Sequence, residues 1–231
     1  MRYLIISIFL FLLLSGNVFS QTDEAIGLHS EGGPWQFFPA SNYQEDLPDV
    51  LLIGNSVMNG YHHFVIGSLK GKANVDYWLT PKHLKSEHLF TDLAKVVSFR
   101  EYDIIQFNIG LHGWPKGRIL KEEYKPLLEK YVIIIKENAP SSILIWASTT
   151  PVTEEGKPEL NKEINPTIAR RNIVAADVMK EMNVGVNDLY GLVKEKLYLS
   201  KGDSFHWKSE GYTLMGREVA SRLLSELEKN K

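Results

Sequence analysis

Residues 49–56 of the chain read DVLLIGNS, and this stretch decides the fold class. Asp49–Ile53 is a short and continuous apolar run, which is typical of a strand buried on both faces of a parallel sheet. Gly54 ends the run, and from Val57 to Leu69 the apolar residues return at helical spacing. A buried strand that leads directly into a helix is characteristic of α/β proteins, in which helices connect parallel strands.

The rest of the chain repeats this alternation of strand and helix. Four further apolar runs predict strands at 73–78, 103–108, 143–147 and 184–187, and helical spacing predicts helices over 89–97, 121–137, 165–182 and 209–228. This order implies right-handed crossovers that place helices on both faces of the sheet. We therefore expect one α/β domain over residues 47–231, with a five-stranded parallel sheet. Residues 21–46 show no clear period and are expected to lie over this domain as an N-terminal arm.

Composition excludes several classes of protein. The chain has 231 residues, of which 44% are hydrophobic and 23% are charged, a mixture typical of globular domains and too apolar for a disordered chain. The formal net charge of −2 offers no basic surface for nucleic acid. The absence of cysteine excludes disulfides, thiolate nucleophiles and zinc–thiolate sites. If the protein uses a nucleophile, a hydroxyl oxygen must therefore take the place of a thiol.

The first twenty residues have the pattern of a secretory signal peptide. Arg2 supplies a positive start, Tyr3–Leu14 is almost wholly apolar, and Val18-Phe19-Ser20 offers small residues where a signal peptidase cleaves. The alternative is a membrane anchor, but the apolar run is shorter than the roughly 20 residues that span a bilayer. We expect cleavage after Ser20, a secreted or periplasmic protein, and no stable membrane insertion afterwards.

A serine follows the first predicted strand. In open α/β sheets, ligands bind outside the carboxyl ends of the strands, which is where Gly54-Asn55-Ser56 lies. A serine on such a turn can expose its hydroxyl at the sheet edge, above the positive end of the following helix. The alternative is that Ser56 caps the helix, a common role for serine at this position.

An Asp-x-x-His pair lies near the other end of the chain, before the last predicted helix. A serine nucleophile needs a base within hydrogen-bond distance and a carboxylate that orients this base. Asp203 and His206 could supply both from one loop. The alternative is a solvated loop with a capping aspartate, and only the serine in the first turn makes the pair noteworthy.

Together, these motifs resemble the SGNH (GDSL) hydrolases, a family of esterases with a flavodoxin-like three-layer α/β/α sandwich. The resemblance covers about Asp49 to Leu227. The family's first block, Gly-Asp-Ser, here reads Gly-Asn-Ser at 54–56, and its last block, Asp-x-x-His, lies at 203–206. The resemblance implies that Ser56 is the nucleophile, His206 the general base and then acid, and Asp203 the carboxylate that orients it.

The middle blocks depart from the family pattern. The third block is Gly-x-Asn-Asp, with the asparagine donating to the oxyanion, but residues 107–113 read FNIGLHG and resemble a subgroup with an Asn-x-Gly-Leu-His signature. His112 stands in the place of the asparagine, and a neutral imidazole N–H can also donate to an oxyanion. Asn108 is the alternative donor, or else a strand-end residue satisfied by a neighbouring loop. The glycine of the second block is missing from 79–88, where Ser86 or another backbone N–H could replace it.

The resemblance implies an esterase that uses a Ser-His-Asp mechanism with no metal or organic cofactor, and the signal-peptide pattern adds that this esterase is exported. We expect its oxyanion hole to combine the Ser56 backbone N–H with His112, and we favour O-acetyl groups on a carbohydrate as substrate. Tryptophans at 78, 114, 146 and 207 lie near predicted strand ends and could line a sugar cleft, although core packing explains Trp146 equally well. The alternative function is a non-catalytic glycan-binding protein that retains the fold. The sequence makes no prediction of oligomeric state.

Overall fold

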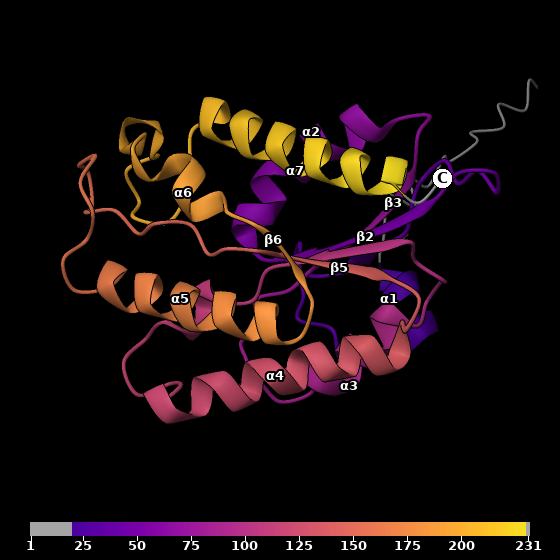
Figure 1. Ribbon diagram of the computed structural model, residues 1–231, viewed down its shortest axis with the longest axis horizontal. Coiled ribbons are helices and arrows are strands. Elements are labelled where there is room, and N and C mark those ends of the chain that lie inside the picture. The colour runs from indigo at the N-terminus through magenta and orange to yellow at the C-terminus, as the bar shows by residue number, and fades with distance from the viewer. Residues whose placement is uncertain (1–19, 230–231) are drawn as a thin grey trace, which may run out of the picture.

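The structure is a computed structural model that describes residues 20–229, so the predicted signal peptide lies outside the described residues except for Ser20. The molecule has three layers, with one sheet between two layers of helices (Figure 1). The sheet has six strands in the order β1-β3-β2-β4-β5-β6. The strands are β1 (Phe37–Phe38), β2 (Asp49–Gly54), β3 (Asn74–Leu79), β4 (Ile104–Phe107), β5 (Ile143–Ala147) and β6 (Gly185–Asn187).

Helices cover both faces of the sheet, as the alternation of strand and helix predicts. One face carries α2 (Ser56–Leu69), α6 (Leu189–Lys194) and α7 (Ser209–Lys229). The other face carries α3 (Leu89–Val97), α4 (Lys121–Asn138) and α5 (Asn165–Glu181), with α1 (Ser20–Ile26) at its edge. Two short 3-10 helices, η1 (Leu111–Gly113) and η2 (Leu197–Leu199), lie in loops after β4 and α6.

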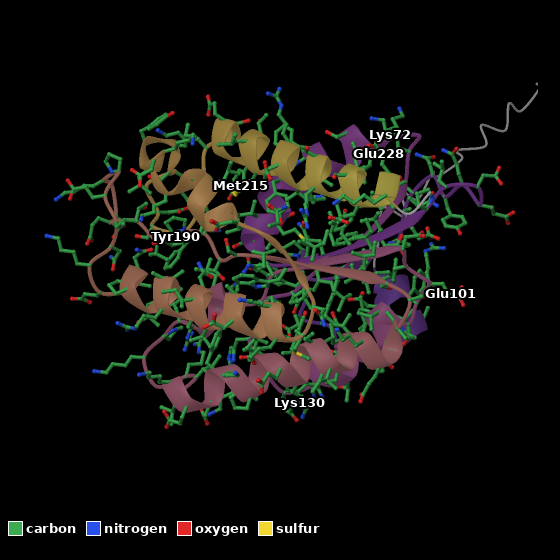
Figure 2. All side chains as sticks on the ribbon, viewed as in Figure 1. Lys72, Glu101, Lys130, Tyr190, Met215 and Glu228 are labelled. Atoms are coloured by element: carbon green, nitrogen blue, oxygen red, sulfur yellow. The ribbon has the colours of Figure 1, made fainter. Side chains whose placement is uncertain are left out.

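The alternation of side chains along each strand divides the core into two halves. In β2, Val50 and Leu52 pack towards α2 and α7, whereas Leu51 and Ile53 pack towards α3 and α4. All four side chains are buried, which explains why the run is continuously apolar. Met215 of α7 is likewise fully buried, whereas Glu101 and Lys130, which Figure 2 also labels, are exposed.

The sheet differs from the prediction in having a sixth strand, which comes from the N-terminal arm. β1 pairs antiparallel with β3, through Phe37 opposite Trp78 and Phe38 opposite Tyr77. The backbone N–H of Phe37 also donates to Oδ1 of Asp23, 2.9 Å away in α1. A strand of two residues is too short to show alternation, so sequence periodicity could not reveal it. The prediction of five parallel strands was correct for β2 to β6 and missed this antiparallel edge.

The order of the strands places the residue after β2 at a distinctive point of the sheet. β2 lies between β3 and β4, so the chain leaves β2 towards one side and later returns on the other. Such a point, where the strand order reverses, is where open α/β sheets bind their ligands. No helix among residues 20–229 combines the length and apolar character needed to cross a membrane.

Candidate active site

Ser56 is the first residue of α2, and Asn55 caps this helix. Oδ1 of Asn55 accepts a hydrogen bond of 3.0 Å from the backbone N–H of Val57, the usual role of a capping side chain. The alternative in which Ser56 caps the helix is therefore wrong, because the residue before it, Asn55, is the cap. As a result, the Ser56 hydroxyl is free to make other contacts, and the side chain is half-buried at the end of the sheet.

The structure brings Ser56, His206 and Asp203 into one hydrogen-bonded chain. Nε2 of His206 lies 2.9 Å from Oγ of Ser56, and Nδ1 of His206 lies 2.8 Å from Oδ2 of Asp203. Because a carboxylate only accepts hydrogen bonds, Nδ1 is the protonated nitrogen, and a neutral imidazole then has Nε2 free to accept from the serine hydroxyl. This tautomer is the one that a general base for Ser56 requires.

The carboxylate of Asp203 is held by the same loop that carries His206. Its Oδ1 accepts from the backbone N–H of His206 at 2.8 Å and from that of Phe205 at 3.2 Å. Burial acts to raise the pKa of Asp203, but the hydrogen bonds from the His206 backbone and ring and from Phe205 outweigh it. The pKa of Asp203 is therefore below its usual value, and the group is ionised at neutral pH.

Backbone hydrogen bonds tie this loop to the loop after β5. Thr153 N–H donates to the carbonyl of Ser204 at 2.9 Å, and Gly156 N–H donates to that of Gly202 at 2.9 Å. Gly202 has a φ of +96°, a conformation in which a side chain would be strained, so glycine suits this position. Two separate loops thus fix the position of the Asp203–His206 pair.

Close packing between α2 and α7 sets the distance between the serine and the histidine. Ser56 begins α2, His206 lies just before α7, and these two helices form the most extensive helix–helix contact. Two glycines lie at the contact. A Cβ on Gly60 would come within 2.2 Å of the Tyr212 ring, and one on Gly216 within 2.5 Å of Cβ of Phe64.

His112 lies in η1, the turn after β4, close enough to His206 for the charge of one ring to affect the other. Its Nε2 is buried and has no hydrogen-bond partner among the described residues. Burial lowers the pKa of His112, and the nearby charges of Arg118 and His206 act in the same direction, against the weaker effect of Glu31. The imidazole is therefore neutral at pH 7, with one N–H to donate.

The other two donors that the sequence suggested are engaged elsewhere. Nδ2 of Asn108 donates to the carbonyl of Ala147 at 2.7 Å and lies 3.4 Å from Oγ1 of Thr149, so its amide connects β4 to the end of β5. The backbone N–H of Ser86 donates to the carbonyl of His83 at 2.7 Å within a turn. By contrast, the backbone N–H of Ser56 has no partner among the described residues. This geometry favours Ser56 and His112 over Asn108 and Ser86.

The aromatic rim of the site differs from the sequence expectation. Trp78, Trp146 and Trp207 are at most 3% exposed and belong to the core, which leaves Trp114 as the tryptophan of that set near the surface. Trp114 stacks on Phe205, in the loop of the triad, at 6.0 Å between ring centroids. Trp35 of the N-terminal arm packs edge-on against His112 at the same distance. The sequence did not single out Trp35, because nothing in a segment without periodicity indicates where it docks.

Comparison with known proteins identifies the fold. No protein-family model matches the chain, and no curated protein sequence does. Three solved structures illustrate the structural likeness. A carbohydrate esterase family 3 structure from Talaromyces cellulolyticus has a TM-score of 0.67 at 13% identity, over 79% of this chain and 99% of that one. A variant of an acetyl xylan esterase from Geobacillus stearothermophilus has a TM-score of 0.61 at 17% identity, over 78% and 94% of the two chains.

The third structure is a lipase/acylhydrolase from Enterococcus faecalis, with a TM-score of 0.63 at 17% identity, over 77% of this chain and 95% of that one. Each likeness spans nearly the whole of the other chain and most of this one. At such low identity, the likeness concerns the fold alone. The α/β/α fold that the sequence predicted is therefore confirmed, and it is one that esterase and acylhydrolase structures share.

Proposed function

We propose that this chain is an exported serine esterase that hydrolyses carboxylic esters, with O-acetyl groups on a carbohydrate as its substrate. The observation that carries the proposal is the hydrogen-bonded chain from Asp203 through His206 to Ser56. The link between Asp203 and His206 measures 2.8 Å, and the link between His206 and Ser56 measures 2.9 Å and joins residues 150 positions apart in the sequence. A serine, a histidine and a carboxylate in this order form the arrangement that activates a serine nucleophile.

In the proposed reaction, Oγ of Ser56 attacks the ester carbonyl while Nε2 of His206 accepts the hydroxyl proton. Asp203 holds the ring in the required tautomer and stabilises the imidazolium that forms. The tetrahedral intermediate then expels the alcohol, which receives the proton from His206. A water molecule, deprotonated by His206 in turn, attacks the acyl-enzyme, and the carboxylic acid leaves as Ser56 regains its proton.

The negative charge on the carbonyl oxygen needs donors that are already in place. The Ser56 backbone N–H is unpaired among the described residues and lies at the positive end of α2. The second donor in this proposal is Nε2 of His112, which is buried and has no hydrogen-bond partner within residues 20–229. Donors that are excluded from water and need no rearrangement stabilise an oxyanion most effectively.

The proposed substrate class rests on two kinds of support. Two of the compared structures are described as a carbohydrate esterase and an acetyl xylan esterase. In addition, two half-buried tryptophans lie near the candidate site, Trp35 against His112 and Trp114 against Phe205 of the triad loop, and the faces of tryptophan rings suit the apolar faces of sugars. Export is proposed from the sequence of residues 1–20, and the N-terminal mass of the protein recovered outside the cytoplasm would test cleavage after Ser20.

The direct test compares the wild-type protein with Ser56→Ala on p-nitrophenyl acetate and on an acetylated xylo-oligosaccharide, by measuring released acetate. We expect a loss of roughly 10⁴- to 10⁶-fold in kcat for Ser56→Ala, because the nucleophile is removed. Ser68→Ala is a matched control, since Ser68 is exposed on the same helix, and its rate should be unchanged. A fluorophosphonate probe should label Ser56 in the wild-type protein.

Equal rates for wild type and Ser56→Ala, with no labelling by the probe, would contradict the esterase proposal. Binding of the oligosaccharide without turnover would then favour the non-catalytic glycan-binding alternative. If the protein hydrolysed p-nitrophenyl acetate but released no acetate from the oligosaccharide, the esterase activity would stand and the proposed carbohydrate substrate would be contradicted.

A further inference from the structure

A large cavity lies beside the candidate active site, between α4, α5 and the loop that precedes α4. Its volume is about 830 Å³, within the range of about 300–1,000 Å³ that is usual for small-molecule sites. Trp114, which stacks on Phe205 on the side of the triad, also lines this cavity. Ser56, His206 and Asp203 do not line it, so the cavity is distinct from the catalytic residues proposed above.

The walls of the cavity are mainly apolar, although two of the apolar side chains are exposed. Leu120 and Ile173 are 46% and 65% exposed, and both line the cavity. They face the same space as Trp114 and Tyr124. Exposed apolar side chains that gather in a hollow, rather than singly on the surface, are characteristic of a ligand site.

The polar residues of the cavity are predominantly basic. Lys116, Lys121, Arg170 and Arg171 line it, together with one acidic residue, Glu163. Among the described residues, none of these five takes part in an ion pair. The local excess of positive charge contrasts with the net charge of −2 of the whole chain. A cavity with this charge attracts anions.

Arg171 places part of this charge in the wall itself. Its guanidinium lies over the Tyr124 ring at 5.1 Å, and Nη2 donates to the carbonyl of Ile119 at 2.9 Å. Nη1 is buried without a hydrogen-bond partner among the described residues. A partly desolvated cation without a counterion is unfavourable, and a bound anion beside it would offset this cost.

We propose that this cavity is a binding site for a monocarboxylate with an apolar body, either aliphatic or aromatic. The apolar body lies between Trp114 and Ile173, and the carboxylate lies among the cations of α5 and the start of α4. The site goes beyond the proposed esterase activity and does not depend on it. Arginine beside an apolar surface is well suited to this ligand, because its guanidinium is weakly hydrated and binds carboxylates with directed hydrogen bonds.

An acidic sugar would carry the same charge but fits the walls less well. Its hydroxyl groups would face leucine, isoleucine and valine side chains, which cannot replace the hydrogen bonds that the hydroxyls make with water. Among the described residues, the lining offers Glu163, Thr167 and Tyr124 besides its four cations, and it contains no asparagine, glutamine or aspartate, so its mainly apolar wall has few groups for the several hydroxyls of a sugar. The observations therefore favour an apolar carboxylate over a uronic acid.

Calorimetric titration of the purified protein with octanoate, octanamide and glucuronate tests the proposal. We expect octanoate to bind at least tenfold more tightly than octanamide, which lacks the charge, and than glucuronate, which lacks the apolar body. Arg171→Gln should weaken octanoate binding at least tenfold. Ser56→Ala should bind octanoate like the wild type, so failure of the esterase proposal would leave this result unaffected.

Ile173→Asp provides a second variant, because Ile173 is largely exposed and its replacement does not disturb the core. The new carboxylate should weaken octanoate binding at least tenfold and leave the melting temperature and p-nitrophenyl acetate hydrolysis unchanged. Ile133→Asp is the matched control, since Ile133 is 43% exposed on α4 and does not line the cavity. Each of four outcomes would overturn the proposal: equal binding of octanoate and octanamide, tighter binding of glucuronate, equal effects of Ile173→Asp and Ile133→Asp, or no saturable binding at millimolar octanoate.

Discussion

The Ser56–His206 side of the candidate site and the His112 side are held by different kinds of structure. Ser56 begins α2, His206 lies in the loop just before α7, and these two helices pack closely together at Gly60 and Gly216. His112 lies in a single 3-10 turn, and its ring contacts Trp35 from the N-terminal arm. Ser56 is therefore held by a regular element and His206 by a loop that is bonded to the loop after β5, whereas His112 depends on a short turn and on the N-terminal arm. Ser56, Asp203 and His206 match the pattern that the sequence resembles, although Asn55 does not, and His112 stands where that pattern has an asparagine.

The triad and the second oxyanion donor differ in how precisely their side chains must be positioned. A nucleophile and its base must remain within hydrogen-bond distance, which requires a rigid support. An oxyanion donor needs only an N–H near the right point, and a backbone amide, an asparagine or a neutral histidine can each provide it. The second donor can thus come from several chemical groups, and it is where this sequence has His112 in place of the asparagine of the pattern that it resembles.

Asp203→Asn should have the largest effect of the variants that follow. The amide can donate to Nδ1 of His206 and so favour the wrong tautomer, with the proton on Nε2. We expect kcat to fall by roughly 10⁴-fold while the fold is retained. Steady-state kinetics on p-nitrophenyl acetate and circular dichroism measure both. Asp177→Asn, an exposed position on α5, is the control, and a loss of less than tenfold for Asp203→Asn would remove this carboxylate from the proposed triad.

His112→Ala tests the other side of the site and should have an intermediate effect. Loss of one oxyanion donor typically costs about 2.7–4 kcal/mol in the transition state, so we expect kcat to fall by roughly 10²- to 10³-fold with little change in KM. His112→Gln retains an N–H donor and should recover part of this loss. His63→Ala changes an exposed histidine of α2 and should have no effect. If His112→Ala retained the full kcat, another group would have to provide the second donor.

Gly216→Ala should have the smallest effect, and on stability more than on chemistry. The added methyl would lie 2.5 Å from Cβ of Phe64 and 3.1 Å from the carbonyl oxygen of Tyr61, so α7 must move away from α2. We expect a loss of about 1–3 kcal/mol in the free energy of unfolding and a lower kcat, because the Ser56–His206 distance depends on this contact.

Chemical denaturation and kinetics measure the two effects, and Gly67→Ala is a matched control. A Cβ on Gly67 would meet nothing within 4 Å, so alanine there should stabilise α2 by about 0.5–1 kcal/mol. Equal stability changes for the two glycine variants would show that helix propensity, rather than the close contact between α2 and α7, determines the outcome.

Much of the fold could be predicted from the sequence because its signals are local. The continuous apolar run of β2 and the helical spacing of α2 arise from neighbouring residues, and both elements lie where these patterns predict them. β1 and α6 escaped prediction because two or six residues are too few to establish a period. The tryptophans show the same limit, since a strand-end position does not reveal whether a ring faces the core or the solvent.

The candidate site divides in the same way. Ser56, Asp203 and His206 could be named from residue type and position, because the carboxyl ends of parallel strands gather at one edge of the sheet. Their hydrogen-bond distances, the capping role of Asn55 and the engagement of Asn108 with Ala147 depend on contacts between residues far apart in the chain. No local pattern determines such contacts.

Three features therefore follow from the amino-acid sequence alone: the order of strands and helices, the restriction of the proposed nucleophile to an oxygen, and the residues that could form a triad. These follow from residue chemistry and from periodicity along the chain. Three further features depend on tertiary packing: which hydrogen-bond donors of the site are unpaired among the described residues, which aromatic rings reach the surface, and where a cavity with apolar walls and basic side chains lies beside Trp114. These properties arise when segments far apart in the chain pack together and exclude water, and they exist only in the folded molecule.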